Sequence, residues 1–518
     1  MLNRRTLIGA AGATTGALLL PSSFAAARQP ARPGVRPRPS GRQRLSGWAR
    51  DTWRSMVAMT HEDTGLVADK ISAGLAAEDR SLNTSPTNIG GYLWSAVVAR
   101  ELKIISHREC DRRVLQTLKT LEDVPHHEPS GMYYNWYDIV DGSVITTWPG
   151  TTDRIYPFMS SVDNGWLGAA LMVVRDAVPA ARRLAGRLFD QMRWDMFYNT
   201  EAPRPGGLIH GGFYDAPPPP DASVFTGNHI GIGPDVWYTN HHYDTTVSET
   251  RITTYLGLIT AQVPASNYYT LWRTFPDGCD WAWQESQPTG RTRTYFGQQV
   301  YEGAYTYRGL KVVPGWGGSM FEELMPDVFV PESQWAPKSW GRNHPQHVRA
   351  QIEHGLVEAK YGYWGFSPSS NPAGGYREYG VDQLGLNPDG YCSDQESTNV
   401  DAGFGACRTG LNPNPTFGDG VVTPHASFLA MMHAPREAIA NLVKIQDTLH
   451  AYGKGGFLDA AATRSATLAE THLSLDQAMI MGALGNVMSR DVMRRAFSTR
   501  AVERRLRPVI GIEEFGVS

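Results

Sequence analysis

The stretch GWGGSMFEELMP, Gly315 to Pro326, sets two adjacent carboxylates, Glu322 and Glu323, among glycines and large apolar side chains. Carboxylates in apolar surroundings cost free energy unless they are paired or used chemically. Trp316 and the glycines fit a loop, and the apolar residues that follow fit the entry into a helix. The stretch therefore predicts a loop that leads into a helix with acidic side chains at its start.

The rest of the chain is dominated by a helical period. The two clearest helices are predicted at residues 160–178 and 344–362, where apolar residues recur on one face. About ten further helical stretches follow, largely in pairs, separated by long segments rich in Gly, Pro and aromatic residues at 197–243, 275–315 and 361–421. Paired helices predict an all-α fold, an (α/α)6 barrel with long aromatic-rich loops that form a cleft. A helical solenoid is the alternative, and the lack of a short repeat counts against it.

Composition limits the possible functions. Lys and Arg number 48 and Asp and Glu 51, a net charge of −3, so no basic surface for a nucleic acid is indicated. The 15 Trp and 22 Tyr residues fit loops that contact sugars, and they fit an aromatic core equally well.

The N-terminus predicts export. Arg4 and Arg5 form a twin-arginine pair, an apolar run covers 8–20, and Ala25-Ala26-Ala27 resembles a cleavage site. We expect a Tat signal peptide at 1–27, a Pro/Arg-rich linker at 28–42 and one catalytic domain at 43–518. The mature protein would be secreted or periplasmic, with no membrane contact after signal cleavage.

Cysteine spacing and nucleotide motifs give mostly exclusions. Cys392 and Cys407 share one loop-like stretch and could form a disulfide after export, whereas the pairing of Cys110 and Cys279 stays open. The chain has no C-x-x-C, H-E-x-x-H, P-loop or G-x-S-x-G motif. We therefore expect no metal and no cofactor, and a monomer whose partner is a polysaccharide or oligosaccharide substrate.

Carboxylates near aromatic residues recur at the start of predicted helices or in the loops before them. They are Asp138, Asp141, Asp163, Glu249, Glu322, Glu323 and Asp459. Glycoside hydrolysis needs two carboxyl groups, one protonated as the acid and one ionised as base or nucleophile. Structural roles compete with this interpretation: Asp163 fits a first-turn acid, Glu249 fits a capping interaction, and Asp476 fits a helix start.

Several blocks resemble the glycoamylase-like domains of cyclic β-1,2-glucan synthases and the endo-β-1,2-glucanases of glycoside hydrolase family 144. The blocks are GWGGSMFEELMPDVF, YGYWGFSPSSN, YREYGVDQLGL, VVTPHASFLAMMHAPREAIANL, AYGKGGFLDAAA and LSLDQAMIMGAL, preceded by YNWYD, SSVDNGWLGAAL and VSETRITTYLGLI. They span roughly residues 90–490 in the family's order. The resemblance implies an (α/α)6 barrel that hydrolyses β-1,2-linked glucan, with inversion.

The resemblance also implies site residues. Glu249 would be the general acid, and Asp138, Asp141 and Asp163 would supply the base or position the water. The residues expected to contact substrate are Glu322, Trp136, Trp166, Trp316, Trp364, Tyr137 and Asp459. Glu323 would be a helix-start charge. One departure is Pro368, which stands where the synthase-type block has a Glu; Glu378 lies close enough in sequence to substitute.

The sequence thus predicts an exported glycoside hydrolase that acts on a β-glucan, and the substrate it favours is β-1,2-glucan or its oligosaccharides. The alternatives are a hydrolase of another bacterial glycan such as an arabinan, a polysaccharide lyase on a similar toroid, and a non-catalytic glycan-binding protein.

Overall fold

The computed structural model describes residues 41–274, 287–386 and 417–517. The predicted signal peptide, the linker up to residue 40, Cys279, Cys392 and Cys407 lie outside these residues, and Cys110 is a buried free thiol. Residues 41–518 form one compact unit. Within the described part of the chain, no helix is long and apolar enough to span a bilayer.

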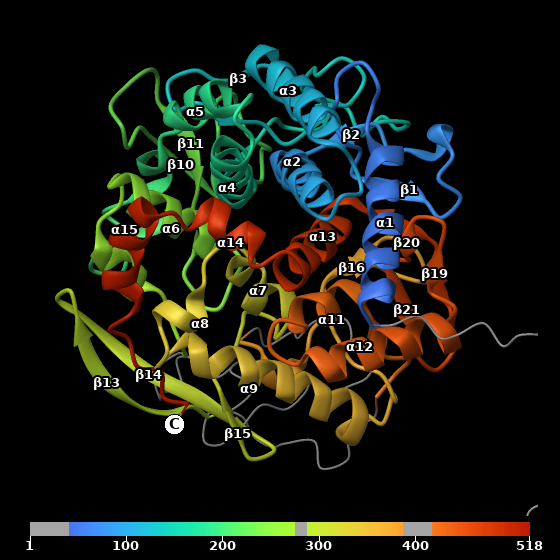
Figure 1. Cartoon of the computed structure of the whole chain (residues 1–518). Helices are drawn as coiled ribbons and strands as arrows, with labels where there is room; N and C mark the ends of the chain where they lie inside the picture. The colour runs from blue at the N-terminus through green and yellow to red at the C-terminus, as the bar shows by residue number, and fades with distance from the viewer. Residues whose placement is uncertain (1–40, 275–286, 387–416, 518) are drawn as a thin grey trace, which may run out of the picture. The chain divides into compact units, whose positions relative to one another are not determined.

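Helices make up most of the regular structure (Figure 1). Their bounds are α1 Gly41–Met59, α2 Pro86–Glu101, α3 His107–Asp123, α4 Ser161–Ala177, α5 Arg182–Asp190, α6 Arg251–Thr260, α7 Met320–Leu324, α8 Glu332–Trp335, α9 Trp340–Glu353, α11 Pro424–Ala430, α12 Pro435–Lys444, α13 Ser474–Met488, α14 Val492–Phe497 and α15 Arg500–Ile510. Serine caps begin three of them, because the Ser85, Ser106 and Ser160 side chains accept the N3 backbone N–H of α2, α3 and α4.

The helices divide into buried and half-buried ones. α2, α4 and α13 are buried along most of their length, as their all-round apolar sequences require. α3, by contrast, buries one face built on Cys110, Val114, Leu118 and Leu121. Each of the three buried helices packs against a more exposed neighbour, α13 against α1, α2 against α3 and α4 against α5 (Figure 1). The same division holds for α11, which packs on α13 and α7 and is covered by α12.

The structure corrects the all-α expectation, because many short strands join the helices. The strands are β1 Lys70–Ser72, β2 Asn83–Thr84, β3 His126–His127, β4 Met132–Tyr133, β5 Tyr137–Asp138, β6 Met159–Ser160, β7 Tyr198–Asn199, β8 Leu208–His210, β9 Gly212–Tyr214, β10 Val224–Gly227, β11 Val236–Thr239, β12 His242–Tyr243, β13 Thr289–Tyr295, β14 Gln298–Tyr307, β15 Leu310–Val312, β16 Ser369–Ser370, β17 Tyr376–Arg377, β18 Val421–Val422, β19 Tyr452–Gly453, β20 Gly456–Phe457, β21 Ala460–Ala462, β22 Leu468–Ala469 and β23 Thr471–Leu473.

The larger sheets fall where long loops were expected. Segment 198–243 supplies the order β12-β8-β7 and most of β10-β11-β9-β6, and segment 289–312 forms the meander β13-β14-β15. This meander lies beside α9 in Figure 1. Its turns carry Phe296-Gly297 and Arg308-Gly309, with positive φ at both positions of each pair. Two-residue turns of this kind suit antiparallel strands, although a side chain at the first position is less common than Asn or Asp.

An aromatic cluster joins the buried helices. Trp94 of α2 and Trp166 of α4 both contact Phe329, with ring centroids 5.1 and 5.5 Å away. Both tryptophans are almost fully buried. Trp94 Nε1 donates to the carbonyl of Ala478 in α13 at 2.9 Å, so the one polar atom of this ring is satisfied across a helix interface.

We predict that Asn164→Ala lowers the unfolding free energy by about 2 kcal/mol, because it leaves buried backbone groups unpaired. Asn164 is fully buried, and its amide exchanges hydrogen bonds with both backbone groups of Tyr133, at 2.8 and 2.9 Å. The measurement is urea denaturation. Asn240→Ala is the matched control, because the exposed Asn240 amide donates only to Ser223. Equal losses for the two variants would contradict this account.

Candidate active site

Acidic side chains gather around the first turns of α2, α4 and α13 and the segments before α6 and α7. Asp163 in the first turn of α4 accepts the Thr87 hydroxyl of α2 at 2.6 Å. Asp69 accepts the Asn88 amide of α2 at 2.9 Å, and its carbonyl accepts the N–H of Ser474 in α13. The first turns of three buried helices therefore meet at one acidic region.

Glu249 is the acid of this region best suited to donate a proton. It lies in the turn before α6 and is partly exposed. Burial raises the pKa of Glu249 to about 7 and the Glu378 carboxyl adds to that shift, while Ser248 and Arg251 act in the opposite direction. A carboxyl group with this pKa is largely protonated at pH 6 and can still ionise during a reaction.

Glu322, in the first turn of α7, is a second acid that Glu249 influences. It is 2% exposed, and its Oε2 accepts the N–H groups of Gly317 and Ser319 at 3.1 Å and the Ser319 hydroxyl at 2.9 Å. Burial, and next the Glu249 carboxyl, raise the pKa of Glu322 to about 8. A side chain at Gly315 would place its Cβ 3.0 Å from Glu322 Oε2. The glycine therefore keeps the space that this carboxyl occupies.

Tyr243 and Tyr376 are each influenced by the charges of Glu249 and Glu378, which indicates that these acids lie near one another. The Tyr243 phenol interacts electrostatically with Glu249, Asp163 and Glu378, which, after burial, raise its pKa. Tyr376, in β17, is 56% exposed. Burial of its phenol raises its pKa, and the charges of two aspartates and of Glu378 and Glu249 raise it further. The two phenols therefore link Asp163 and Glu249 to a region that solvent reaches.

Asp459 and Asp476 are those two aspartates, and they form a buried pair. Asp459 is 1% exposed and accepts the Ser370 N–H at 2.7 Å, and Asp476 is 3% exposed. Burial and the Asp476 charge raise the pKa of Asp459 well above its usual range, and burial raises that of Asp476 to about 8. His425 Nδ1 lies 3.0 Å from Asp476, but burial lowers the pKa of His425 to about 4. The pair therefore holds protons at neutral pH.

Asp138 ends strand β5, and Asp141 lies in the turn that follows it. Asp138 Oδ1 accepts the Val140 N–H at 2.7 Å, and Asp141 Oδ1 accepts the Ser143 N–H at 2.8 Å. The Ser143 hydrogen bonds hold the pKa of the exposed Asp141 below its usual value. Among the contacts of the described residues, neither carboxylate meets Glu249. A shared site with Glu249 was expected for both, and the structure gives them a local role.

The predicted aromatic contacts are only partly accessible. Trp316 is 38% exposed, and the partly exposed Trp136 packs edge-on against Trp148 at 5.8 Å. Three other expectations were wrong, because the side chains belong to the core: Trp166 and Trp364 are each 2% exposed and Tyr137 is fully buried. The Tyr137 hydroxyl donates to the Pro125 carbonyl at 2.6 Å and accepts the N–H of Tyr134.

Glu323 lies in the first turn of α7, as expected of a helix-start charge, but it is not solvated. Its side chain is fully buried, with Oε1 2.5 Å from His344 Nδ1 and with the Asn343 amide at 3.0 and 3.1 Å. Burial alone would lower the pKa of His344, but Glu323 and Asp327 raise it to about 10. The resulting imidazolium holds the pKa of Glu323 below its usual value against the effect of burial.

Asp327, Glu332 and His344 come close enough to one another to be tested as a metal site. Most of their oxygen atoms are already engaged, since Glu332 accepts two hydrogen bonds from Arg251 and Asp327 Oδ2 accepts one from Arg494 at 2.7 Å, while Asp327 Oδ1 lies 3.8 Å from His344 Nε2. His344 is protonated and therefore offers no lone pair. The three residues fit an internal ion-pair cluster and not the ligand set of a divalent cation.

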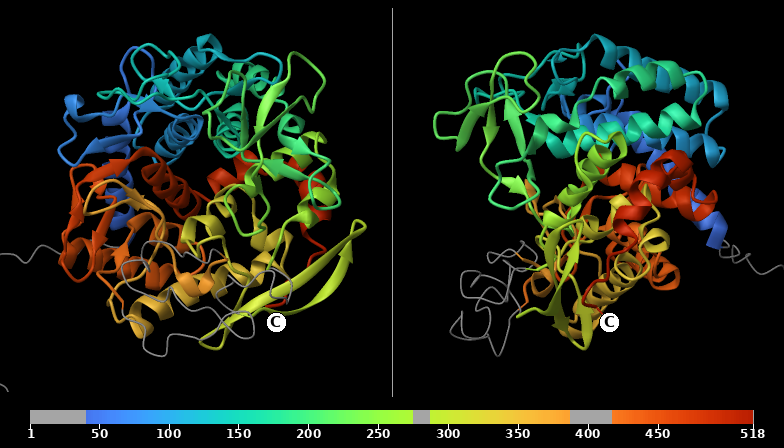
Figure 2. Two further views of the ribbon diagram at one scale, coloured as in Figure 1. Left: turned by 180° about the vertical axis from the view of Figure 1, so that it is seen from behind. Right: turned by 90° about the vertical axis from the view of Figure 1, so that its left-hand side faces the viewer.

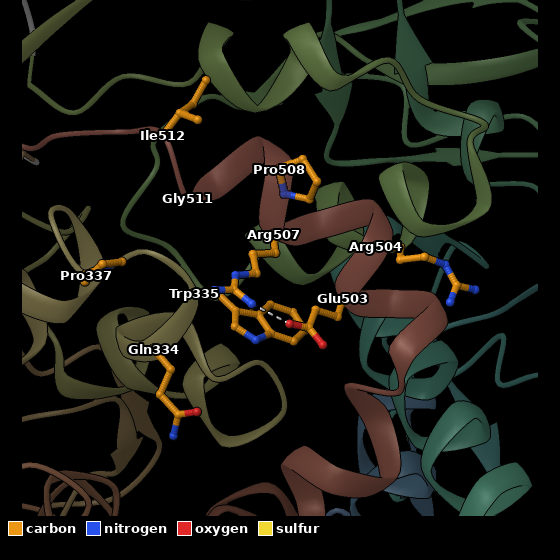
Figure 3. A pocket seen from close by; sticks show the side chains of 9 residues that line it. All are labelled: Gln334, Trp335, Pro337, Glu503, Arg504, Arg507, Pro508, Gly511 and Ile512. Carbon is orange, nitrogen blue, oxygen red and sulfur yellow. Dashed lines mark hydrogen bonds and ion pairs between the residues drawn. The ribbon is translucent and has the colours of Figure 1, made fainter.

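A surface groove of about 570 Å³ lies between α8 and α15 (Figure 3). Trp335, Pro508 and Ile512 give it apolar walls, and its one carboxylate, Glu503, is paired with Arg507 at 2.7 Å. A hydrolytic site needs two carboxyl groups. The groove is therefore not the candidate active site.

Tyr243, Tyr376, Asp69 and the pairing of Asp476 were not predicted from the sequence. Asp476 occupies the first turn of α13 as Asp163 occupies that of α4. That shared position was the available signal, because first turns of neighbouring helices converge at one end. The two tyrosines sit on strands β12 and β17, which were not expected.

A largely helical protein in which buried carboxyl groups with raised pKa values surround one partly exposed acid, Glu249, is the class that this fold and site define. Residues 241–500 match the family described as "Glycoamylase: Putative glucoamylase", and the chain belongs to this family. Residues 47–199 match a second family, which is described only as DUF3131, a protein of unknown function.

One curated relative is the cyclic β-(1,2)-glucan synthase NdvB of Rhizobium meliloti, 26% identical over 268 residues. The match covers 49% of this chain and 7% of the synthase, so the chain spans a small part of that relative. Among solved structures, the endo-β-1,2-glucanase of Chitinophaga pinensis aligns with a TM-score of 0.62 at 15% identity, over 91% of this chain and 98% of that one. That of Talaromyces funiculosus aligns with a TM-score of 0.58 at 12% identity, over 92% and 96%. These likenesses show a shared fold.

We predict that Asp476→Asn stabilises the protein at pH 8 and leaves its stability unchanged at pH 3. The folded pKa of Asp476 is about 8 against an ordinary value of 3.8, so the wild type loses stability as pH rises between these values. The variant removes that loss, and melting temperatures across the range measure it. Asp141→Asn is the control of opposite sign, because the folded pKa of Asp141 is lowered. A constant difference between Asp476→Asn and wild type from pH 3 to 8 would contradict the buried-pair account.

Proposed function

We propose that the protein is a glycoside hydrolase that cleaves a β-glucan, with β-1,2-glucan or its oligosaccharides as substrate. The observation that carries this proposal is the partly exposed Glu249, whose pKa of about 7 makes it a proton donor beside further carboxyl groups. Membership of the Glycoamylase family agrees with it.

Glu249 would protonate the glycosidic oxygen as the bond to the anomeric carbon breaks. Asp163 would take a proton from a water molecule that attacks the opposite face of the sugar, giving inversion. Asp163 suits this role because its carboxylate is partly exposed and is oriented by the Thr87 hydroxyl. The exposed Glu378 is the other candidate base, since it acts on Glu249 and Tyr243 alike.

The linkage is inferred from relatives. The names of the Rhizobium synthase and of the Chitinophaga and Talaromyces enzymes all specify β-1,2-glucan, and the Chitinophaga enzyme was solved with sophorotriose and glucose. Trp316, Trp136 and Tyr376 are the exposed or partly exposed aromatic side chains that could stack on glucose rings.

We also propose that the helices close into an (α/α)6 toroid and that the protein is exported as a monomer. The contacts of α2 with α4, α4 with α6, α7 with α11, α11 with α13 and α13 with α2 support the toroid. Arg251 joins α6 to α7. The twin-arginine sequence supports export.

The substrate is tested with a panel of linkage-defined glucans and an arabinan, with product size and anomeric configuration as readouts. We expect β-1,2-glucan to be cut with inversion. Cleavage of another glycan alone would overturn the linkage, unsaturated products would indicate a lyase, and binding without cleavage would indicate a non-catalytic protein.

We predict that Glu249→Gln and Asp163→Asn each lower kcat on β-1,2-glucan by roughly 100- to 10,000-fold. An aryl glucoside with a good leaving group needs no protonation, so it should restore activity to Glu249→Gln and not to Asp163→Asn. Asp138→Asn is the matched control and should stay within about threefold of wild type. If the aryl substrate rescued Asp163→Asn instead, the two roles would be exchanged.

We predict that kcat/KM of the wild type falls as pH rises above about 7, because the Glu249 carboxyl then loses the proton that it donates. The measurement is a pH profile at low substrate concentration. With an aryl substrate that needs no acid, this decline should disappear. A decline that persists with the aryl substrate would assign the alkaline limb to another group.

A further inference from the structure

Arg251 joins the segments of Glu249 and Glu322. It is 1% exposed, and each of its five N–H donors has an acceptor. Nε and Nη2 bind the two Glu332 oxygens at 2.8 and 2.9 Å. The other three N–H groups bind the carbonyls of Ser248 at 2.9 Å, Glu322 at 2.6 Å and Glu323 at 2.6 Å.

Those three carbonyls lie next to the acids. Ser248 immediately precedes Glu249 in the chain, and the Glu322 carbonyl belongs to the same residue as the buried carboxyl. α7 has only five residues, so its C-terminal carbonyls lack further helical turns to hold them. The guanidinium therefore fixes the end of α7 against the start of α6.

The guanidinium is itself held in place. The Trp340 ring lies 4.3 Å from Arg251 Cζ, and the Tyr255 hydroxyl donates to Glu332 Oε1 at 2.5 Å. His344 Nε2 lies 3.2 Å from the other Glu332 oxygen. The side chains that surround the guanidinium, here called the seat of Arg251, come from α6, α8 and α9. They keep the N–H groups of Arg251 from rotating toward other acceptors.

We propose that Arg251 is a positioning residue that sets the separation of the Glu249 and Glu322 carboxyl groups through their backbones. The inference rests on the proposed function of Glu249 as the acid. Arg251 does not touch substrate in this account. Its planar fork holds two chain segments whose relative shift would move the acid away from the glycosidic oxygen.

Arg273 offers a matched control elsewhere in the fold. It is also 1% exposed, binds one acid, Glu513, and donates to the carbonyls of Tyr268 and Leu271. Its guanidinium also lies near an aromatic ring, 5.1 Å from Tyr268. Arg273 therefore repeats the burial and bonding of Arg251 without contacting either acidic segment.

The test compares Arg251→Lys with Arg273→Lys. Lysine keeps the charge but has three donors on a point-like group, so it cannot satisfy all five acceptors. We expect Arg251→Lys to lower kcat roughly 10- to 100-fold with KM changed less than about threefold. Arg273→Lys should lose melting temperature to a similar extent, with kcat within about threefold of wild type.

A second readout does not need activity. The groups that face the Glu249 carboxyl are Arg251 on its own segment, Glu322 on α7, Glu378 after β17, and the phenols Tyr243 and Tyr376. Glu249 is the charge that, after burial, raises the pKa of Glu322, and in Arg251→Lys the lysine charge remains while the two acids move apart. The Glu322 carboxyl should then titrate at lower pH in Arg251→Lys, as measured by pH-difference infrared spectra assigned with Glu322→Gln.

The outcomes separate the two proposals. A wild type that cuts no glycan would overturn the proposed function, yet the infrared titration would still decide the role of Arg251. The positioning role is overturned if Arg251→Lys leaves kcat and the Glu322 titration unchanged, or if Arg273→Lys lowers kcat equally. If Arg251→Lys does not fold, Glu332→Gln, which weakens the seat but keeps the guanidinium, should show the same changes in smaller size. Unchanged kcat and titration in Glu332→Gln would overturn the role.

Discussion

The buried pair of Arg251 and Glu332 is the interaction on which the acidic end of this fold depends. Both side chains are nearly or fully buried, and such a pair is stable only when its remaining donors and acceptors are satisfied. Here the remaining donors of Arg251 go to three backbone carbonyls, and Tyr255 and His344 approach Glu332. Removing Glu332 would leave the Arg251 charge unpaired in the protein interior, and removing Arg251 would leave both the Glu332 charge and three carbonyls unpaired, so several chain segments are stabilised by one contact.

Glu322 and Glu323, which are neighbours in the chain, lie in opposite electrostatic environments. The two carboxyl groups are adjacent in the chain, both are buried, and their pKa values shift in opposite directions. Glu323 faces the His344 imidazolium, whereas Glu322 faces Glu249. One side of α7 therefore belongs to a balanced ion cluster with low carboxyl pKa values, and the other belongs to an acid-rich region with raised ones. The short helix is the boundary between structural charge and chemically usable acid.

Part of this could be predicted from the sequence. Helical periodicity found the main helices, and the concentration of acids at helix starts pointed to Asp163, Glu249 and Glu322. The tryptophans show the limit. Trp166 was expected at a sugar subsite, yet it lies in the apolar stretch that predicted its helix, and its ring is buried in the core. Residue type alone does not tell a buried ring from an exposed one, because both are common in aromatic-rich proteins. The strands were missed because Phe-Gly and Arg-Gly turns lack the usual Asn-Gly signal.

The acid-rich region carries a stability cost that follows from its chemistry. Asp476, Glu322 and Glu249 all have pKa values raised above their ordinary ones. Each of them therefore lowers the stability of the folded protein as the pH rises toward neutrality. A core of this size could bury apolar residues at those positions with less cost. The backbone contacts of Arg251, the capping box of Ser319 and the glycine at 315 all act to hold these acids where solvation alone would not. Such costly placement is typical of groups that are kept for their proton transfer and not for their contribution to folding.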